Sequence, residues 1–97
     1  MKKIYLSGPI SGTTDFKDRF LCAELDMCNL FRFPKIRNPV KFCSHLDPWK
    51  TSWAEYMDVC IPELEGCTHI YMMDGWEDSK GACVEYYLAR QFGLTFI

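Results

Sequence analysis

The sequence lacks any long hydrophobic run. No stretch of its 97 residues approaches the roughly 18 consecutive apolar residues that a membrane-spanning helix needs. The opening Met1-Lys2-Lys3 leads directly into a short strand-like run and not into the apolar core of a secretory signal. These two absences predict a cytoplasmic protein with no membrane partner.

The sequence also has little excess charge of either sign. Its 11 lysines and arginines and 13 aspartates and glutamates give a formal net charge of -2, and the cations are scattered along the chain. A nucleic-acid-binding domain normally gathers its cations on one face or along one helix. Hydrophobic residues make up 48% and charged residues 25%, an ordinary globular composition that argues against a disordered chain. We therefore expect a small-molecule ligand and no nucleic acid polymer.

Metal-binding spacings are missing, although the chain has six cysteines. Cys43-Ser44-His45 has the composition of half a metal site, but no CxxC or HxxxH pattern accompanies it. Cysteines of an intracellular protein are normally reduced. We expect no metal, and we favour buried free thiols over a disulfide framework.

The usual nucleotide-binding glycine motifs are missing too. The loop Ser7-Gly8-Pro9-Ile10-Ser11-Gly12 follows a strand-like run, but it has neither the GxGxxG pattern nor the lysine of a P-loop. We therefore do not expect a conventional dinucleotide or P-loop site, and we expect no cofactor.

What the sequence does contain is an alternation of strand-like and helix-like segments. We expect strands at residues 4–7, 35–37, 68–73 and 94–97, helices at residues 14–31, 53–64 and 79–92, and a long loop at about 38–50. The order β-α-β-α-β-α-β predicts a parallel sheet with right-handed crossovers. The expected fold is α/β: a small Rossmann-like or flavodoxin-like three-layer domain with a four-stranded parallel sheet, with residues 1–97 forming a single domain.

Capping residues support the helix boundaries. Ser52 and Glu55 form a capping-box pattern, and Gly93 is placed to end the last helix. One of residues 13–15 is expected to cap the first helix. Pro62 should kink or weaken the last turns of the second helix.

The length of the chain favours self-association. A domain of 97 residues buries only about 60 to 70% of the surface that its unfolded chain exposes. A second copy would enlarge this small core. We expect a homodimer or a higher homo-oligomer.

Residues 74–85 concentrate the chemically informative features. They contain a turn, a helix start that Ser79 can cap, and a carboxylate, Glu85, six residues past the cap. The segment follows the apolar run 70–73, so it lies beyond a strand's carboxyl end, where open α/β sheets bind ligands. Such a helix start attracts phosphate or carboxylate, although Ser79 alternatively does no more than cap the helix. Gly81 either lets a ligand approach the backbone or permits tight helix packing.

Glu85 lies on the helical period between Ala82 and Ala89, which directs it toward a mostly apolar side. A carboxylate on such a side is seldom buried without a partner, and this favours a functional role. The alternative is a rotated helix that leaves Glu85 at a wet boundary. Tyr5 lies in an expected central strand, where an aromatic residue is by default part of the core.

Taken together, these segments resemble a known family. The resemblance rests on residues 5–12, Asn38-Pro39, residues 53–57, Gly75-Trp76, Ser79, Gly81 and Glu85. They resemble the short nucleoside 2-deoxyribosyltransferase-like proteins of phages and bacteria. More distantly, nearly the whole chain is similar to characterised nucleoside 2-deoxyribosyltransferases and 2'-deoxynucleoside 5'-monophosphate N-glycosidases. The resemblance implies a transferase or hydrolase that exchanges or cleaves the N-glycosidic bond of a deoxynucleoside or its 5'-monophosphate.

The resemblance also implies roles for the matched residues. Glu85 would be the nucleophile that attacks C1' of deoxyribose, and Tyr5 would orient it. The remaining positions would bind the substrate, with Ser79 favouring a nucleotide over a free nucleoside and Trp76 stacking on the base or packing at a subunit contact: Ser7, Gly8, Pro9, Ile10, Gly75, Trp76, Ser79 and Gly81.

Two positions depart from the active relatives, which carry an aspartate before the third strand and another at its start. Here these positions are Cys60 and Thr68, and neither replaces a carboxylic acid near neutral pH. Loss of general acid catalysis typically costs about 10² to 10⁴ in rate. The sequence therefore leaves two further hypotheses beside the enzyme: a weak or inactive protein that binds and sequesters a nucleotide, and a partner-binding domain with Phe33, Phe42 and Trp49 exposed.

Overall fold

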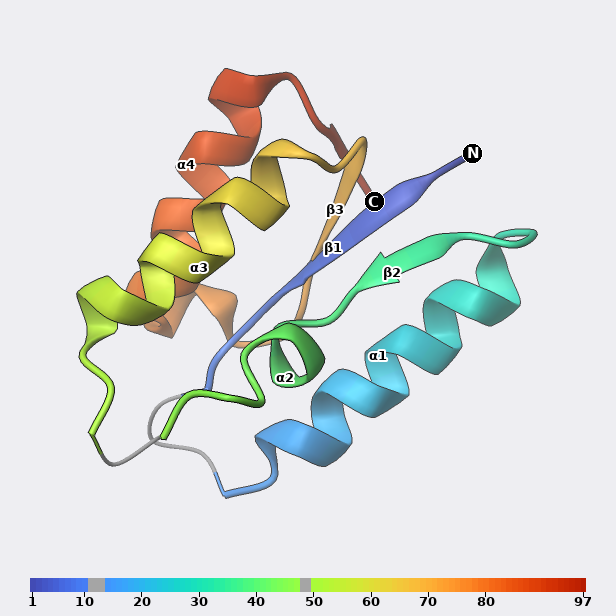
Figure 1. Ribbon diagram of the computed structural model, residues 1–97. Helices are drawn as coiled ribbons and strands as arrows, with labels where there is room; N and C mark the ends of the chain where they lie inside the picture. Colours follow the sequence, from blue (N-terminus) through green and yellow to red (C-terminus); the bar gives the residue numbers. More distant parts are fainter. Residues whose placement is uncertain (11–13, 48–49) are drawn as a thin grey trace.

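The structure, a computed structural model, describes residues 1–10, 14–47 and 50–97 and contains a four-stranded sheet with helices on both faces (Figure 1). The strands lie in the order β2-β1-β3-β4, and every neighbouring pair is parallel. Their bounds are β1 Lys3–Ser7, β2 Lys35–Arg37, β3 His69–Met72 and β4 Thr95–Phe96. This sheet confirms the expected α/β fold of the Rossmann-like or flavodoxin-like three-layer type.

The strand order places a topological switch point between β1 and β3. The chain leaves β1 toward β2 on one side of the sheet and leaves β3 toward β4 on the other. In the register of these two strands, Ile4 lies beside His69 and Ser7 beside Met72. The loops that follow β1 and β3 therefore meet at the carboxyl edge of the sheet, which is where open α/β sheets bind ligands.

Helix α1 (Phe16–Leu30) lies on one face of the sheet, and α3 (Trp53–Glu65) and α4 (Lys80–Phe92) lie on the other (Figure 1). Because successive side chains of a strand point to opposite faces, β1 contributes to two separate cores. Ile4 and Leu6 pack with the buried face of α1. Tyr5 packs with residues from α3 and α4.

The helix ends follow the capping signals of the sequence. The Ser52 hydroxyl accepts a hydrogen bond from the Glu55 amide at 3.2 Å, and the Ser52 amide donates to Glu55 Oε1 at 3.1 Å, so the capping box is confirmed. Gly93 ends α4 with φ of 77°, a left-handed conformation that suits glycine. Asp15 precedes α1 as its N-cap residue without a side-chain capping bond. Residues 11–13, which include the candidate cap Thr13, lie outside the described residues.

The segment expected to be a long loop instead contains a short helix, α2 (Pro39–Phe42). The Asn38 side chain accepts a hydrogen bond from the Val40 amide at 3.0 Å, and Pro39 occupies the first helical position. An Asn at the N-cap followed by Pro at the first helical position is typical of a helix start. The prediction from sequence was wrong here, because it interpreted Asn38-Pro39 as the end of a strand.

The same segment held the residues expected to be exposed in a partner-binding domain. Phe33 is 78% exposed, as expected. Phe42 is not: its ring lies 6.1 Å from that of Tyr5, so its predicted exposure is wrong. Trp49 lies outside the described residues.

Two smaller features complete the fold. A 3-10 helix, η1 (Trp76–Asp78), precedes α4, and α3 continues past Pro62 to Glu65. In the described part of the chain, no helix has the length and apolar character needed to cross a membrane.

Candidate functional site

The candidate site is built where α4 crosses the carboxyl half of β1. The Glu85 side chain points from α4 toward the sheet and is 6% exposed. Its Oε1 accepts a hydrogen bond from the Ser7 hydroxyl at 2.7 Å, and its Oε2 accepts one from the Tyr5 hydroxyl. The prediction that Glu85 lies on the apolar side of its helix is confirmed. Both carboxyl oxygens are held by side chains of β1.

Strand and helix periods together explain this convergence. Tyr5 and Ser7 are two residues apart, so both point to the α4 face of the sheet. Ala82, Glu85 and Ala89 are the buried residues of α4, spaced three and four apart. The two alanines let the helix lie close to the strand, which brings the Glu85 carboxyl within reach of short side chains.

The electrostatics of the site follow from burial. Burial raises the pKa of the Glu85 carboxyl from 4.5 to about 7, while the hydrogen bonds from Tyr5 and Ser7 act in the opposite direction. Burial, with the nearby Glu85 charge, raises the pKa of Tyr5 well above its usual value, so its hydroxyl remains a donor. Glu85 is consequently a buried carboxyl that is part ionised near neutral pH.

Two thiols extend this hydrogen-bonded group. The Cys60 thiol of α3 interacts with the Tyr5 hydroxyl, and its sulfur lies 3.9 Å from that of Cys43, which follows α2. Burial raises the pKa of the Cys60 thiol well above its usual range, so it is neutral at physiological pH. The apolar period of α3 predicted that Cys60 is buried, but no sequence signal placed Cys43 beside it.

Thr68, the other position where the resemblance implies an aspartate, lies elsewhere. Its hydroxyl contacts the backbone of Lys3 and the ring of His69, at the amino end of the sheet. Ser7, which holds Glu85, is four residues further along β1, roughly 13 Å away at the usual rise of a strand. The structure therefore brings Cys60, and not Thr68, to the Glu85 site.

The loops after β1 and β3 meet as the switch point requires. A Cβ on Gly8 would lie 2.9 Å from the Met73 Cβ, so the two segments touch without room for a side chain. Gly75 has φ of 86°, and a Cβ there would lie 3.4 Å from the Pro9 ring. Ile10 is half-buried beside these loops, and Ser11 and Gly12 lie outside the described residues.

Trp76 of η1 belongs to an aromatic stack. Its ring lies 4.8 Å from that of Tyr86 at an interplanar angle of 12°, and Tyr86 in turn packs against Phe96 at 5.1 Å. One face of the indole is therefore occupied by Tyr86. Stacking of Trp76 on a base stays a prediction for its other face.

Ser79 and Gly81 lie at the start of α4. The Ser79 hydroxyl accepts a hydrogen bond from the Ala82 amide at 3.2 Å, which confirms its capping role. A Cβ on Gly81 would meet Trp53 and Met57 of α3 at 3.5 and 3.6 Å, ordinary contact distances, so Gly81 faces the neighbouring helix. A contact of either residue with a ligand remains a prediction.

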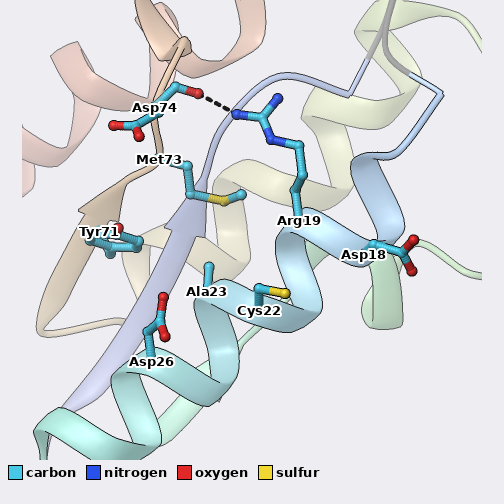
Figure 2. Close-up of a pocket in the computed structure, with 8 residues that line it drawn as sticks. All are labelled: Asp18, Arg19, Cys22, Ala23, Asp26, Tyr71, Met73 and Asp74. Carbon is cyan, nitrogen blue, oxygen red and sulfur yellow. Dashed lines mark hydrogen bonds between the residues drawn. The ribbon is translucent and has the colours of Figure 1, made fainter.

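Arg19 is a residue at this edge that sequence reasoning did not single out. Figure 2 shows its guanidinium reaching from α1 to the loop after β3, where Nη2 donates to the Asp74 carbonyl at 2.6 Å. This contact lines a hollow of about 280 Å³ between α1 and β3, on the face of the sheet opposite Glu85. Only the fold brings α1 and this loop together, so no local pattern could have predicted it.

Over the described ranges, no group of three or more His, Cys, Asp or Glu side chains could hold a metal ion.

Comparison with known proteins identifies a family. None of the curated proteins and none of the solved structures matches the chain significantly. One family model does, and it covers residues 2–97. The chain therefore belongs to the DUF4406 family, whose description is a domain of unknown function.

Proposed function

We propose that this protein binds a 2'-deoxynucleoside or its 5'-monophosphate at the carboxyl edge of the sheet and cleaves or exchanges its N-glycosidic bond. The observation that carries the proposal is the Glu85 carboxyl, buried and hydrogen-bonded on both oxygens by Ser7 and Tyr5. A buried carboxylate held by two donors from a neighbouring strand is costly unless it has a role. The resemblance of the same residues to deoxyribosyltransferases supplies the chemistry.

In the proposed reaction, ionised Glu85 attacks C1' of deoxyribose, and the bond from C1' to the base nitrogen breaks. The bonding pair leaves with the base, which takes a proton from solvent water, and a glycosyl ester forms on Glu85; the water or second base that later attacks C1' returns a proton to the solvent. Water then attacks C1' and releases the sugar, or a second base attacks and yields a new nucleoside. Glu85 is regenerated as a carboxylate in either case, and the configuration at C1' is retained.

The neighbouring residues hold the nucleophile in place. Ser7 and Tyr5 fix the two oxygens of Glu85, which limits the rotation of the carboxyl and keeps it aimed. Gly8, Pro9 and Ile10 follow β1, and Gly75 follows β3, so the proposed substrate-binding loops lie at the same carboxyl edge as Ser7. The start of α4 is the proposed phosphate site, because first-turn amides and the helix dipole favour an anion there.

The test is base release from the four deoxynucleosides and their 5'-monophosphates, followed by chromatography. We expect release by the native protein, with a rate that rises with pH through about 7 because the ionised form of Glu85 is the nucleophile. Glu85→Gln should lower the rate by at least about 10³-fold. The matched control is Glu77→Gln, an exposed carboxylate on η1, which should leave the rate unchanged. Undiminished release by Glu85→Gln would contradict the proposal.

A second function, binding without turnover, is favoured by one observation. The position nearest Tyr5 where the active relatives carry an acid is Cys60, whose buried neutral thiol is a poor proton donor to a departing base. Calorimetry separates the two functions. Saturable binding of a deoxynucleoside monophosphate without base release supports sequestration, and failure to bind any nucleoside or nucleotide counts against both.

A further inference from the structure

Two buried thiols lie in contact behind the Glu85 site, and the proposed chemistry of Glu85 uses neither of them. The sulfur of Cys60, on α3, lies 3.9 Å from the sulfur of Cys43, which follows α2. Both residues belong to the same buried cluster as Tyr5. In the described part of the chain, no second pair of cysteine sulfurs is joined by such a contact. Two thiols this close form a candidate site for chemistry between sulfur atoms.

The number of protons fixes the direction of the hydrogen bonds that join these thiols to Glu85. The Tyr5 hydroxyl has one proton, which it donates to Glu85 Oε2. In the contact between Tyr5 and Cys60, the hydroxyl oxygen is therefore the acceptor and the thiol is the donor. Because this uses the one proton of Cys60, the Cys43 thiol donates to the Cys60 sulfur. Three donors, each with one proton, thus form a chain that runs from Cys43 to Glu85.

The two thiols differ in how solvent can reach them. Burial raises the pKa of both, so the closed protein resists oxidation. The backbone of Cys43 is held by local bonds: its amide donates to the Pro39 carbonyl at 2.9 Å, and its carbonyl accepts from the Leu46 amide at 3.0 Å. A short segment held by bonds within itself opens locally at a lower cost than a strand or a long helix. Cys60 lies on a long helix, so a small reagent from solvent reaches Cys43 first.

We propose that Cys43 and Cys60 are an oxidation site, at which a hydroperoxide converts the two thiols into a disulfide and so weakens the hydrogen bond from Tyr5 to Glu85. In the open segment, the Cys43 thiolate attacks a peroxide oxygen, the oxygen–oxygen bond breaks, and Cys43 becomes a sulfenic acid. The Cys60 sulfur then attacks the Cys43 sulfur, and the oxygen leaves as water with the Cys60 proton. Two thiols and one hydrogen peroxide thus give one disulfide and two waters, and the peroxide takes up the two electrons.

The disulfide acts on Glu85 because it has no proton to donate. The two sulfurs approach by about 1.9 Å on closure, and the Tyr5 oxygen loses the hydrogen bond from Cys60. A hydroxyl that accepts a hydrogen bond is itself a stronger donor, so this loss weakens the bond from Tyr5 to Glu85. Burial raises the pKa of Glu85, the bonds from Tyr5 and Ser7 lower it, and no charged side chain contributes. Oxidation should therefore raise the pKa of Glu85.

The first test uses a variant that keeps only the two thiols of the proposed site. It carries four substitutions: Cys22→Ser, Cys28→Ser, Cys67→Ala and Cys83→Ser. Cys67 is removed because it shares a tryptic peptide, residues 51–80, with Cys60. After one equivalent of hydrogen peroxide, mass spectrometry should show the loss of two hydrogen atoms. Peptides 42–50 and 51–80 should be linked, and dithiothreitol should separate them.

The control adds Cys60→Ala to this variant, and oxidation of Cys43 should then give no linked peptide. If the fourfold variant does not fold, sequencing of the linked peptides from the native protein makes the same assignment. Separate oxidation of the two sulfurs, or cross-links in the native protein that leave out Cys60, would overturn the proposal.

The second test is an NMR titration of the Glu85 carboxyl in the reduced and the oxidised protein. The midpoint should move up on oxidation by roughly 0.1 to 0.6 of a pH unit. Cys60→Ala should move it in the same direction without oxidation, and Cys60→Ser, which keeps a proton donor, should restore it. Equal midpoints in the reduced and oxidised forms would overturn the link to Glu85. Neither test measures base release, so each outcome is independent of the proposed function.

Discussion

The two faces of the sheet differ in what the same strand gives to each. On the α3 and α4 face, β1 presents Tyr5 and Ser7, which hold a buried carboxyl. On the α1 face, the same strand presents Ile4 and Leu6, which pack with apolar side chains of α1. Neighbouring residues of β1 therefore have different partners: Tyr5 and Ser7 hold a buried carboxyl, and Ile4 and Leu6 belong to an apolar core.

This division has a physical basis. A fully apolar core is stabilised by burial of surface, and its free energy of unfolding depends little on pH. A buried carboxyl contributes through hydrogen bonds and pays a desolvation cost that changes with its ionisation. Substitutions on the α1 face should therefore change stability, and substitutions on the α4 face should change titration and activity.

The largest expected effect on stability is at Leu6, on the α1 face. Leu6 is fully buried, so Leu6→Ala should lower the free energy of unfolding by about 3 kcal/mol through lost burial and a residual cavity. Leu25→Ala is the matched control, because Leu25 of α1 is 54% exposed and its loss should change stability by less than about 0.5 kcal/mol. Denaturant unfolding measures both. Equal losses at the two positions would remove the distinction between the faces.

The next effect is the pH dependence of stability caused by Glu85. Its pKa is raised from 4.5 to about 7 in the folded protein, so the folded state holds the proton more tightly than the unfolded state. The stabilising contribution is complete below about pH 4.5 and is lost as pH rises to about 7. The free energy of unfolding should fall by on the order of 2 to 3 kcal/mol across this range.

Glu85→Gln isolates that contribution. Glutamine does not titrate, so the fall in stability between about pH 4.5 and 7 should disappear in this variant. Glu77→Gln removes an exposed carboxyl and should keep the native pH dependence. Unfolding curves at a series of pH values measure both variants. A pH dependence that persists in Glu85→Gln would show that another group is responsible.

The smallest of the three effects is at Tyr5. Tyr5→Phe removes a donor to Glu85 Oε2, which should raise the pKa of Glu85 by about one further unit. Base release at pH 7 should fall about fivefold, because less of Glu85 is ionised at that pH, and it should recover at higher pH, where Glu85 is again ionised. An NMR titration of the Glu85 carboxyl measures the same shift without relying on activity.

Tyr56→Phe is the control for this prediction. Tyr56 is half-buried and packs against the same core cluster as Tyr5. Loss of its hydroxyl should leave the midpoint of the Glu85 titration in place. If both variants moved that midpoint equally, the hydrogen bond from Tyr5 would not be what controls it.

The parts of the fold that sequence predicted are those specified by local patterns. Helix ends are marked by capping bonds that span only a few residues, so local sequence predicted them correctly at Ser52 with Glu55, at Ser79 and at Gly93. The helical period likewise placed Glu85 on the buried side of α4. Asn38 carried a comparable local signal for α2, which was misread because a strand precedes it directly.

The parts that sequence did not predict depend on contacts between distant segments. The bond from Ser7 to Glu85 joins residues 78 apart in the chain, and the contact of Cys43 with Cys60 joins two different helical segments. Arg19 reaches the Asp74 carbonyl only because α1 lies beside the loop after β3. Such contacts are set by the packing of whole elements, and no period or motif in one segment encodes them.

The close contact between Gly8 and Met73 has a consequence for how variants of this protein are interpreted. A methyl group at position 8 would meet the Met73 Cβ, an atom fixed to the backbone, so β1 and the segment after β3 would have to separate. Such a shear would carry Ser7 away from Glu85, although alanine at position 8 adds no polar or reactive atom. A selection for activity would then retain glycine at position 8. Gly8 would look like a catalytic residue, although the constraint on it is steric: there is no room for one additional carbon atom.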